Sequence, residues 1–91
     1  MPTRPSQNDP DRAAQWGRIR ADVGARIRHV RQREGLTQEQ LALSSGVTRN
    51  VLIDVEHGRR GLLYERLFDI AAALGVGVGE LVADGPKGPA S

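Results

Sequence analysis

The sequence contains no cysteine, and its only aromatic residues are one Trp, one Tyr and one Phe. The absence of cysteine excludes a disulfide-stabilised scaffold and a thiolate zinc site. With so few aromatics, the core has to be made from Leu, Ile, Val and Ala side chains. No run approaches the roughly 20 apolar residues of a membrane-spanning helix, and the polar N-terminus lacks the apolar run of a signal peptide. We therefore expect a cytoplasmic protein that does not bind membranes.

A length of 91 residues corresponds to one small domain with little room for a deep substrate pocket. The two histidines, His29 and His57, have no third metal ligand at helical spacing. Asp54 and Glu56 face different sides of a predicted helix, so they do not form a catalytic carboxylate pair. The sequence also lacks a phosphate-binding loop and a dinucleotide-binding fingerprint. We therefore expect no enzyme activity, no metal and no cofactor.

Positive charge is concentrated in one stretch, although the formal net charge is only +2. The stretch from position 12 to position 33 holds seven arginines and a single acidic residue, Asp22. The arginines are Arg12, Arg18, Arg20, Arg26, Arg28, Arg31 and Arg33. Such a stretch either attracts a polyanion or forms a solvated helix flank, and composition alone leaves both readings open.

Proline and glycine mark the two ends of the chain. Residues 1–12 contain Pro2, Pro5 and Pro10 among polar residues, and residues 84–91 combine glycine with proline. Both segments are predicted to be flexible tails. Between them, residues 13–83 form one predicted domain in which the periodicity is helical and no alternating strand pattern occurs. The sequence therefore predicts an all-α fold.

The first predicted helix covers residues 13–34 and carries an apolar stripe at spacings of three and four. The stripe consists of Trp16, Ile19, Val23, Ile27 and Val30. Gly24 interrupts it and should weaken the helix by about 1 kcal/mol relative to alanine. The segment is therefore either one long helix or two helices that meet near Asp22, and Gly35 ends it.

Capping signals define two short helices next. Thr37 and Gln40 form a capping box for a helix that stops at Gly46. Thr48 is a good N-cap for the following helix, which runs to Glu56. Glycine at position 58 is then placed to end this helix in a left-handed turn.

A fourth helix is predicted from Leu63 to Leu74, with no Ser, Thr or Asp to cap its start. The side chains expected to face inward are Leu67, Ile70, Ala71 and Leu74. Residues 79–82 are expected to add a last turn, which gives five helices in all.

The segment 38–56 is the most specific part of the sequence. Ala42 is small where the two short helices must approach each other, and Gly46 can adopt the positive φ of a sharp turn. The apolar contacts between the helices are expected from Leu41, Val47, Leu52 and Val55. This packing leaves Arg49, Asn50 and Asp54 on the outer face, where a DNA major groove would lie.

The motifs GLTQEQLA at 35–42, GVT at 46–48 and VEHG at 55–58 occur here in order. Together they resemble the Cro/phage-repressor (Xre-like) helix-turn-helix family, and the resemblance extends over about residues 23–82. It implies a five-helix, repressor-like DNA-binding domain, here with an extended first helix. The DNA contacts that it implies are Gln38, Thr48, Arg49, Asn50, Val51, Asp54, Arg59 and Arg60.

The implied role of Gln38 is to contact a backbone phosphate and to brace the reading helix. Arg49 and Asn50 have the chemistry for bidentate contacts to guanine and adenine. A cation at the start of a helix opposes the helix dipole, and an anionic partner would remove that conflict from Arg49. Arg59 and Arg60 correspond to a loop that contacts phosphate. These assignments favour DNA contact over a solvated helix and loop.

Two further positions leave alternatives open. Val51 either meets a thymine methyl group or is partly buried in the fold. Asp54 either accepts a hydrogen bond from cytosine or orients Arg49 or Asn50 one turn back, and the second role is favoured.

Arg31 and Glu56 match a buried ion pair of the family, which is a structural role. Two departures from the family pattern are the polar Ser45 and the loop at 61–64, where many members have Pro or Ser.

The resulting hypothesis is a sequence-specific, DNA-binding transcriptional regulator that binds a palindromic operator as a homodimer. The alternative is an antitoxin or adaptor whose main role is to bind a protein partner such as a toxin, with autoregulatory DNA binding. Its support is the segment from Trp16 to Ile19 and the apolar cluster at 62–64. Trp16 and Ile19 serve either the monomer's own core or a subunit contact, and their helical spacing favours the subunit contact.

Overall fold

The computed structural model describes residues 9–82, and every regular element in this part of the chain is helical. The elements are α1 (Pro10–Arg33), α2 (Gln38–Ser45), α3 (Arg49–Glu56), α4 (Tyr64–Leu74) and the 3-10 turn η1 (Val78–Glu80). The all-α class is confirmed. The expected count of five helices is not confirmed, because residues 9–82 contain four α-helices and the expected last turn is the short 3-10 element η1. A longer helix is disfavoured here because Gly77 and Gly79 would lose more backbone conformational entropy in it than other residues would.

The first helix begins at Pro10, earlier than the start at position 13 that the apolar periodicity predicts. The side chain of Asp9 accepts hydrogen bonds from two backbone N–H groups of the first turn, at 3.0 and 3.4 Å. Proline fits the first helical position because its missing N–H would have no partner there. Residues 9–12 are therefore helical or capping, and the rest of both predicted tails lies outside the described residues.

Gly24 marks a close approach of two helices and does not break α1, which is continuous over 24 residues. It is buried against the end of α3, where a β-carbon would overlap the carbonyl oxygen of Val55 and lie 3.0 Å from that of Glu56. A second glycine, Gly58, lies against the backbone of Ala21. The absence of a side chain at 24 and 58 lets the backbones of α1 and α3 come into contact.

The caps of α2 and α3 form as the sequence predicts. Thr37 Oγ1 accepts from the backbone N–H of Gln40 at 3.0 Å, and the Gln40 side chain accepts from the backbone N–H of Thr37 at 2.8 Å. Gly46 ends α2 with a φ of 76°. Thr48 then caps α3 by accepting from the N–H of Val51. These local bonds set where each short helix starts and stops.

The polar residue at position 45 has a structural explanation. Ser45 is buried in the turn between α2 and α3, and its hydroxyl accepts from the backbone N–H of Val47 at 3.2 Å. The same hydroxyl lies 3.5 Å from the carbonyl oxygen of Ala42, to which it donates. The side chain therefore satisfies a buried backbone donor inside the turn, which a small apolar residue could not do.

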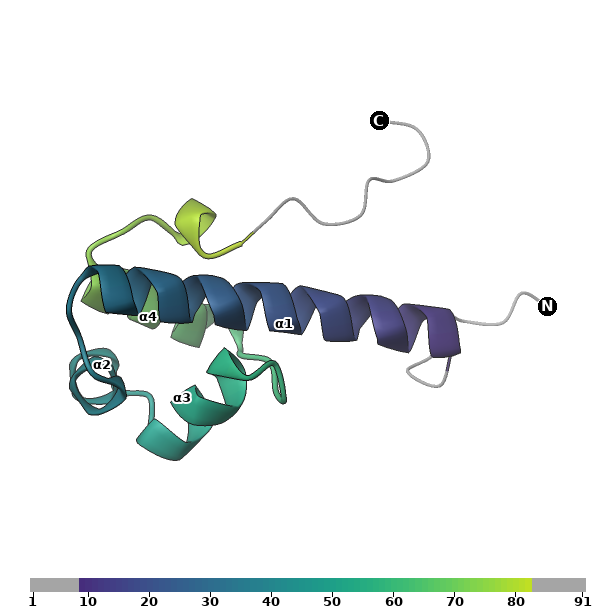
Figure 1. Cartoon of the computed structure of the whole chain (residues 1–91), viewed down its shortest axis with the longest axis horizontal. Helices are drawn as coiled ribbons and strands as arrows, with labels where there is room; N and C mark the ends of the chain where they lie inside the picture. The colour runs from purple at the N-terminus through teal and green to yellow at the C-terminus, as the bar shows by residue number, and fades with distance from the viewer. Residues whose placement is uncertain (1–8, 83–91) are drawn as a thin grey trace.

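The core lies where α1 packs on α3 and α2 packs on both α3 and α4 (Figure 1). The last turn, η1, packs against α4 and contributes the fully buried Leu81. Of the residues expected to face inward on α4, Leu67 is only half-buried at the edge of this core. The buried apolar side chains are Ile27, Val30, Leu41, Ala42, Val47, Leu52, Val55, Ile70, Ala71, Leu74 and Leu81.

A polar clamp, the ion pairs of Arg33 with Glu80 and Glu34, connects the end of α1 to η1. Arg33 donates to the carboxylate of Glu80 at 3.2 Å and to that of Glu34 at 3.3 Å. The hydrogen bonds to Glu80 and then Glu34 raise the pKa of Arg33, which is protonated at any ordinary pH in either case. The clamp is exposed to solvent, so its contribution to stability is small.

Candidate nucleic-acid interface

The outer face of α3 begins with two exposed polar residues. Arg49 and Asn50 lie in the first turn and are exposed, whereas Leu52 and Val55 on the opposite side are buried. Thr48 is also exposed, and its hydroxyl is used as the N-cap of the helix. The structure therefore places three of the predicted contact residues together at one accessible end of α3.

Val51 belongs to the inner edge of the same helix. It is half-buried and packs against the hydrophobic core. Of the two readings that the sequence left open, burial in the fold is what the structure shows. A contact from its remaining surface to a thymine methyl group stays a prediction.

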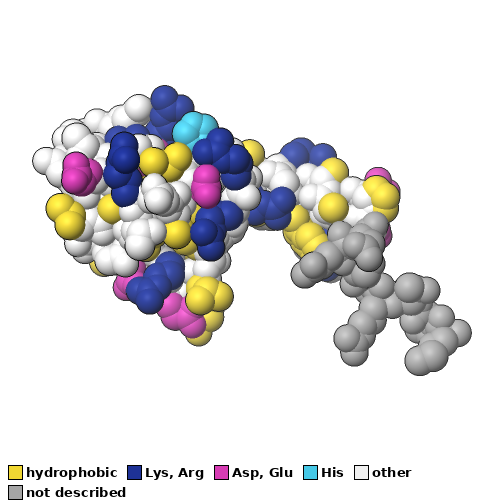
Figure 2. All heavy atoms as spheres, turned by 90° about the horizontal axis from the view of Figure 1, so that it is seen from below, with side chains coloured by type: hydrophobic (Ala, Val, Ile, Leu, Met, Phe, Trp, Pro, Cys, Tyr) yellow, Lys and Arg dark blue, Asp and Glu magenta, His cyan; other side chains and the backbone are white. Residues whose placement is uncertain are grey.

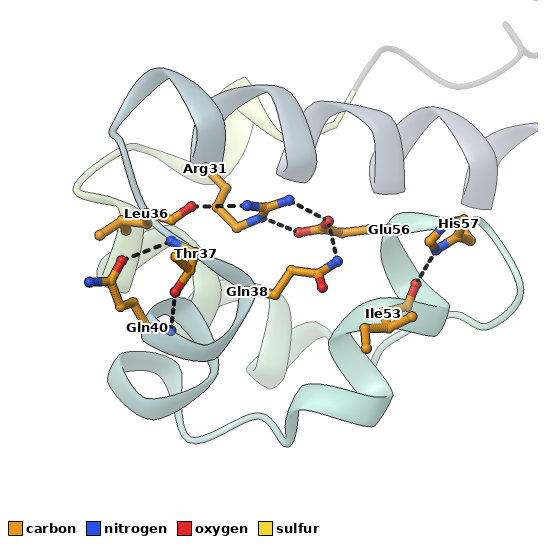
Figure 3. Close-up of polar contacts among 8 residues, drawn as sticks. All are labelled: Arg31, Leu36, Thr37, Gln38, Gln40, Ile53, Glu56 and His57. Carbon is orange, nitrogen blue, oxygen red and sulfur yellow. Dashed lines mark hydrogen bonds and ion pairs between the residues drawn. The ribbon is translucent and has the colours of Figure 1, made fainter.

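A buried ion pair joins α1 to the last turn of α3 (Figure 3). Arg31 donates from Nε and Nη2 to the two carboxylate oxygens of Glu56, at 2.7 and 3.0 Å. The side chains are only 10% and 1% exposed. The third donor, Arg31 Nη1, binds the carbonyl oxygen of Leu36 at 2.9 Å in the turn that leads into α2. The predicted structural role of this pair is confirmed.

Gln38 extends this network from α2. Its side-chain amide donates to Glu56 Oε1 at 3.1 Å, as Figure 3 shows. The bracing role predicted for Gln38 is therefore present, because one carboxylate on α3 is bound by side chains from both α1 and α2. These bonds tie the C-terminal end of α3 to both α1 and α2. The predicted phosphate contact of Gln38 stays a prediction.

An open groove of about 540 Å³ lies beside this network. It is bounded by the end of α1, the start of α2 and the end of α3, and its lining includes Arg28, Gln38 and His57. The sequence interpretation did not include Arg28 among the contact residues. The only signal for it was its membership of the arginine-rich stretch, because its position at this groove depends on the packing of three helices.

The carboxylate of Asp54 is bound by Arg59. Asp54 Oδ1 accepts from Arg59 Nε at 3.1 Å, so the prediction that Asp54 orients Arg49 or Asn50 is wrong. The reason is the turn that ends α3. Gly58 has a φ of 72°, and the backbone N–H of Arg59 donates to the carbonyl oxygen of Asp54 at 2.8 Å. This turn brings Arg59 back over Asp54.

Basic side chains spread over the face that α3 and the following loop share. Arg59 and Arg60 are exposed in this loop, and Arg28 and Arg49 are exposed beside it. Figure 2 looks at the molecule from this side and shows dark blue side chains distributed across the surface. The pairing with Arg59 neutralises the acidic Asp54 within this face, and a phosphate backbone approaching α3 would therefore meet little repulsion.

Other kinds of site are not found in the described residues. Between residues 9 and 82, no group of three or more His, Asp or Glu side chains could hold a metal ion. No helix in that part of the chain combines the length and apolarity needed to cross a membrane. The arrangement of α2 and α3, with a sharp turn between them and a basic outer face, is that of a helix-turn-helix DNA-binding domain.

Comparison with known proteins supports this class. The helix-turn-helix family model matches residues 27–81. An HTH-type transcriptional regulator of Sinorhizobium fredii is 37% identical over 71 residues, which cover 78% of this chain and 92% of that protein. The immunity repressor protein of Bacillus phage phi105 is 37% identical over 62 residues, which cover 68% of this chain but only 43% of the repressor.

A solved structure gives the same result. The restriction-modification controller protein from Aeromonas hydrophila superposes with a TM-score of 0.69 at 34% identity, over 71% of this chain and 94% of that protein. The chain belongs to the helix-turn-helix family of the Cro/phage-repressor type. Its relatives are transcriptional regulators and not enzymes. This chain is a transcriptional regulator with a helix-turn-helix DNA-binding domain.

Proposed function

We propose that this regulator binds a palindromic operator as a homodimer, with α3 reading base edges in the major groove. The observation that carries the proposal is the exposed pair Arg49 and Asn50 at the start of a helix whose other end is fixed by a buried network. Arginine and asparagine supply the two bidentate contacts that distinguish guanine and adenine in the major groove. The bonds from Arg31 and Gln38 to Glu56 hold α3 in one orientation before DNA arrives.

The phosphate contacts are proposed to flank α3 on both sides. Gln38 and Arg28 lie at the groove beside the start of α2, and Arg59 and Arg60 lie in the loop after α3. Contacts of this kind fix the position of the protein on the duplex and carry no sequence information themselves. Binding through several arginines should weaken steeply as salt concentration rises.

The proposal of a homodimer follows from the size of the reading surface. One eight-residue helix covers few base pairs, and specific affinity in this class comes from two half-sites read by two copies. Two-fold symmetry of the protein then implies a palindromic operator, with half-sites separated by about one helical turn or a multiple of it.

Replacing Arg49 with alanine should lower specific affinity by about 1–3 kcal/mol and relax the preference at one base position. The reason is the loss of a bidentate contact to guanine. The measurement is electrophoretic mobility shift or fluorescence anisotropy on the operator and on single-base variants of it.

Arg66→Ala is the matched control, because it removes the same charge from an exposed arginine on α4 that pairs with Asp69. The control should bind the operator as the unmodified protein does. If Arg49→Ala instead weakens binding equally on all sequences and leaves the base preference intact, Arg49 contacts phosphate only.

An antitoxin or adaptor role is the second candidate, and an exposed apolar group on α4 favours it. Leu63, Tyr64 and Phe68 are 72%, 71% and 58% exposed at the start of this helix. These three side chains are close together at the first turns of α4 and could pack against an apolar surface of a partner protein. A pull-down of co-encoded proteins tests this role: Tyr64→Ser with Phe68→Ser should abolish capture of the partner and retain DNA binding. Capture that survives both substitutions would contradict it.

A further inference from the structure

In the described part of the chain, the first turns of α1 project past α2, α3 and α4 (Figure 1). The sequence left open whether Trp16 and Ile19 serve the monomer's own core or a subunit contact, and Ile19 lies at the edge of the domain, beside Val55 and Leu67. At about 1.5 Å per residue, the 24 residues of α1 extend about 36 Å, well beyond what one small core can cover. The projecting part carries Trp16, the only tryptophan of the chain, which is half-buried, and Ile19, which is 39% exposed.

A small groove opens where this projecting part meets the domain. Its volume is about 190 Å³, and it lies between α1 and the loop that joins α3 to α4. Apolar side chains make most of the lining, together with two arginines. The lining includes Ile19, Val23, Leu62, Leu67, Arg20 and Arg60.

Trp16 lies on the same face of α1 as this groove. At 100° per residue, positions 19, 20 and 23 are within about 60° of position 16 around the helix axis. Side chains on a helix lean toward its N-terminus, however, and Trp16 therefore extends away from the groove. There it stacks under the guanidinium of Arg12, 5.2 Å from the ring centre. The groove is not filled by the tryptophan of its own chain.

The size and position of the groove indicate its occupant. It is smaller than the roughly 300–1,000 Å³ of a small-molecule site and matches a single large side chain. A tryptophan and a groove one to two turns apart on the same helix face form a self-complementary surface, as a two-fold interface requires. We infer that Trp16 of each subunit inserts into the groove of the other. This inference rests on the proposed homodimer and assigns its interface.

The exposed group on α4 offers no comparable concavity, and the Arg66–Asp69 ion pair lies beside it.

The single tryptophan makes the interface directly observable. The emission maximum of the full chain should move to longer wavelength, and quenching by acrylamide should increase, as dilution dissociates the dimer. Light scattering on the same samples gives the oligomeric state. Trp16→Ala should raise the dimer dissociation constant on the order of 100-fold, because each dimer loses two buried aromatic anchors. Ile19→Gln, which alters the groove and keeps the tryptophan, should also weaken the dimer.

Leu43→Ala is the matched control, since it removes a large apolar side chain that is 80% exposed on α2, and it should leave the dimer intact. Circular dichroism checks that each variant retains its helices. If Trp16→Ala stays dimeric, or if tryptophan emission does not change through the dissociation range, the inferred interface is wrong and the homodimer stands. If the unmodified chain is monomeric at all concentrations and binds only half-sites, the proposed homodimer itself fails.

Discussion

Arg31→Ala is expected to destabilise the domain by roughly 3–5 kcal/mol, because it leaves the carboxylate of Glu56 buried without its cationic partner. Glu56 is 1% exposed at its side chain, and the remaining bond from Gln38 cannot neutralise its charge. The backbone carbonyl of Leu36 also loses the hydrogen bond that it accepts from Arg31 Nη1. For a domain of this size, the melting temperature should fall on the order of 20 °C. Thermal unfolding followed by circular dichroism measures the effect.

Two comparisons show whether the loss comes from the unpaired charge. Arg28→Ala removes an exposed arginine one turn earlier on α1 and should change stability by no more than about 0.5 kcal/mol. The double variant Arg31→Met with Glu56→Leu removes both charges and should be less destabilised than Arg31→Ala alone. A variant Arg31→Ala with an unchanged melting temperature but no DNA binding would show that Arg31 contacts DNA instead.

Gly24→Ala should destabilise the domain by more than about 3 kcal/mol, at the upper end of the range for overpacked positions. The added β-carbon would overlap the carbonyl oxygen of Val55, and neither backbone can move without separating α1 from α3. The helix-forming advantage of alanine, about 1 kcal/mol, is too small to offset this overlap. Chemical denaturation with urea measures the change in the free energy of unfolding.

Gly17→Ala, in the same helix, should change the free energy of unfolding in the opposite direction. A β-carbon at Gly17 meets only the end of the Arg20 side chain, at 3.8 Å. Alanine there should therefore stabilise α1, by up to about 1 kcal/mol. If both substitutions stabilise the protein, the close contact between α1 and α3 at Gly24 does not exist in solution.

The sequence was most informative where structure is determined locally. The Thr37–Gln40 capping box, the N-cap at Thr48 and the left-handed Gly46 each depend on residues within four positions, and all of them are present in the structure. The outer face of α3 followed from these boundaries, since a helix with a known start and a known apolar side has only one face left for solvent.

The features that the sequence could not predict depend on packing between distant residues. Gly24 was interpreted as a weakness of α1, because its helix penalty is local while the contact with Val55 that requires it is 31 positions away. Leu81 is fully buried although only a single 3-10 turn precedes it, since α4 holds that turn in place.

The partner of Asp54 was missed for a related reason. Helical spacing pointed to residues one turn back, whereas the turn at Gly58 folds the chain so that Arg59 approaches Asp54 from the other side. The position of Arg28 at the groove beside α2 could not be predicted either, because the groove forms only when α1, α2 and α3 are packed together.

The central claim, that α3 reads a palindromic operator, is tested most directly by in vitro selection of duplex DNA from a random pool by the unmodified chain. The account predicts enrichment of a palindrome with two half-sites about 10 base pairs apart, centre to centre, or a multiple of that spacing. A pool that stays random after repeated rounds, while the protein still binds DNA, would contradict base reading by α3. A single unrepeated half-site would contradict the dimer.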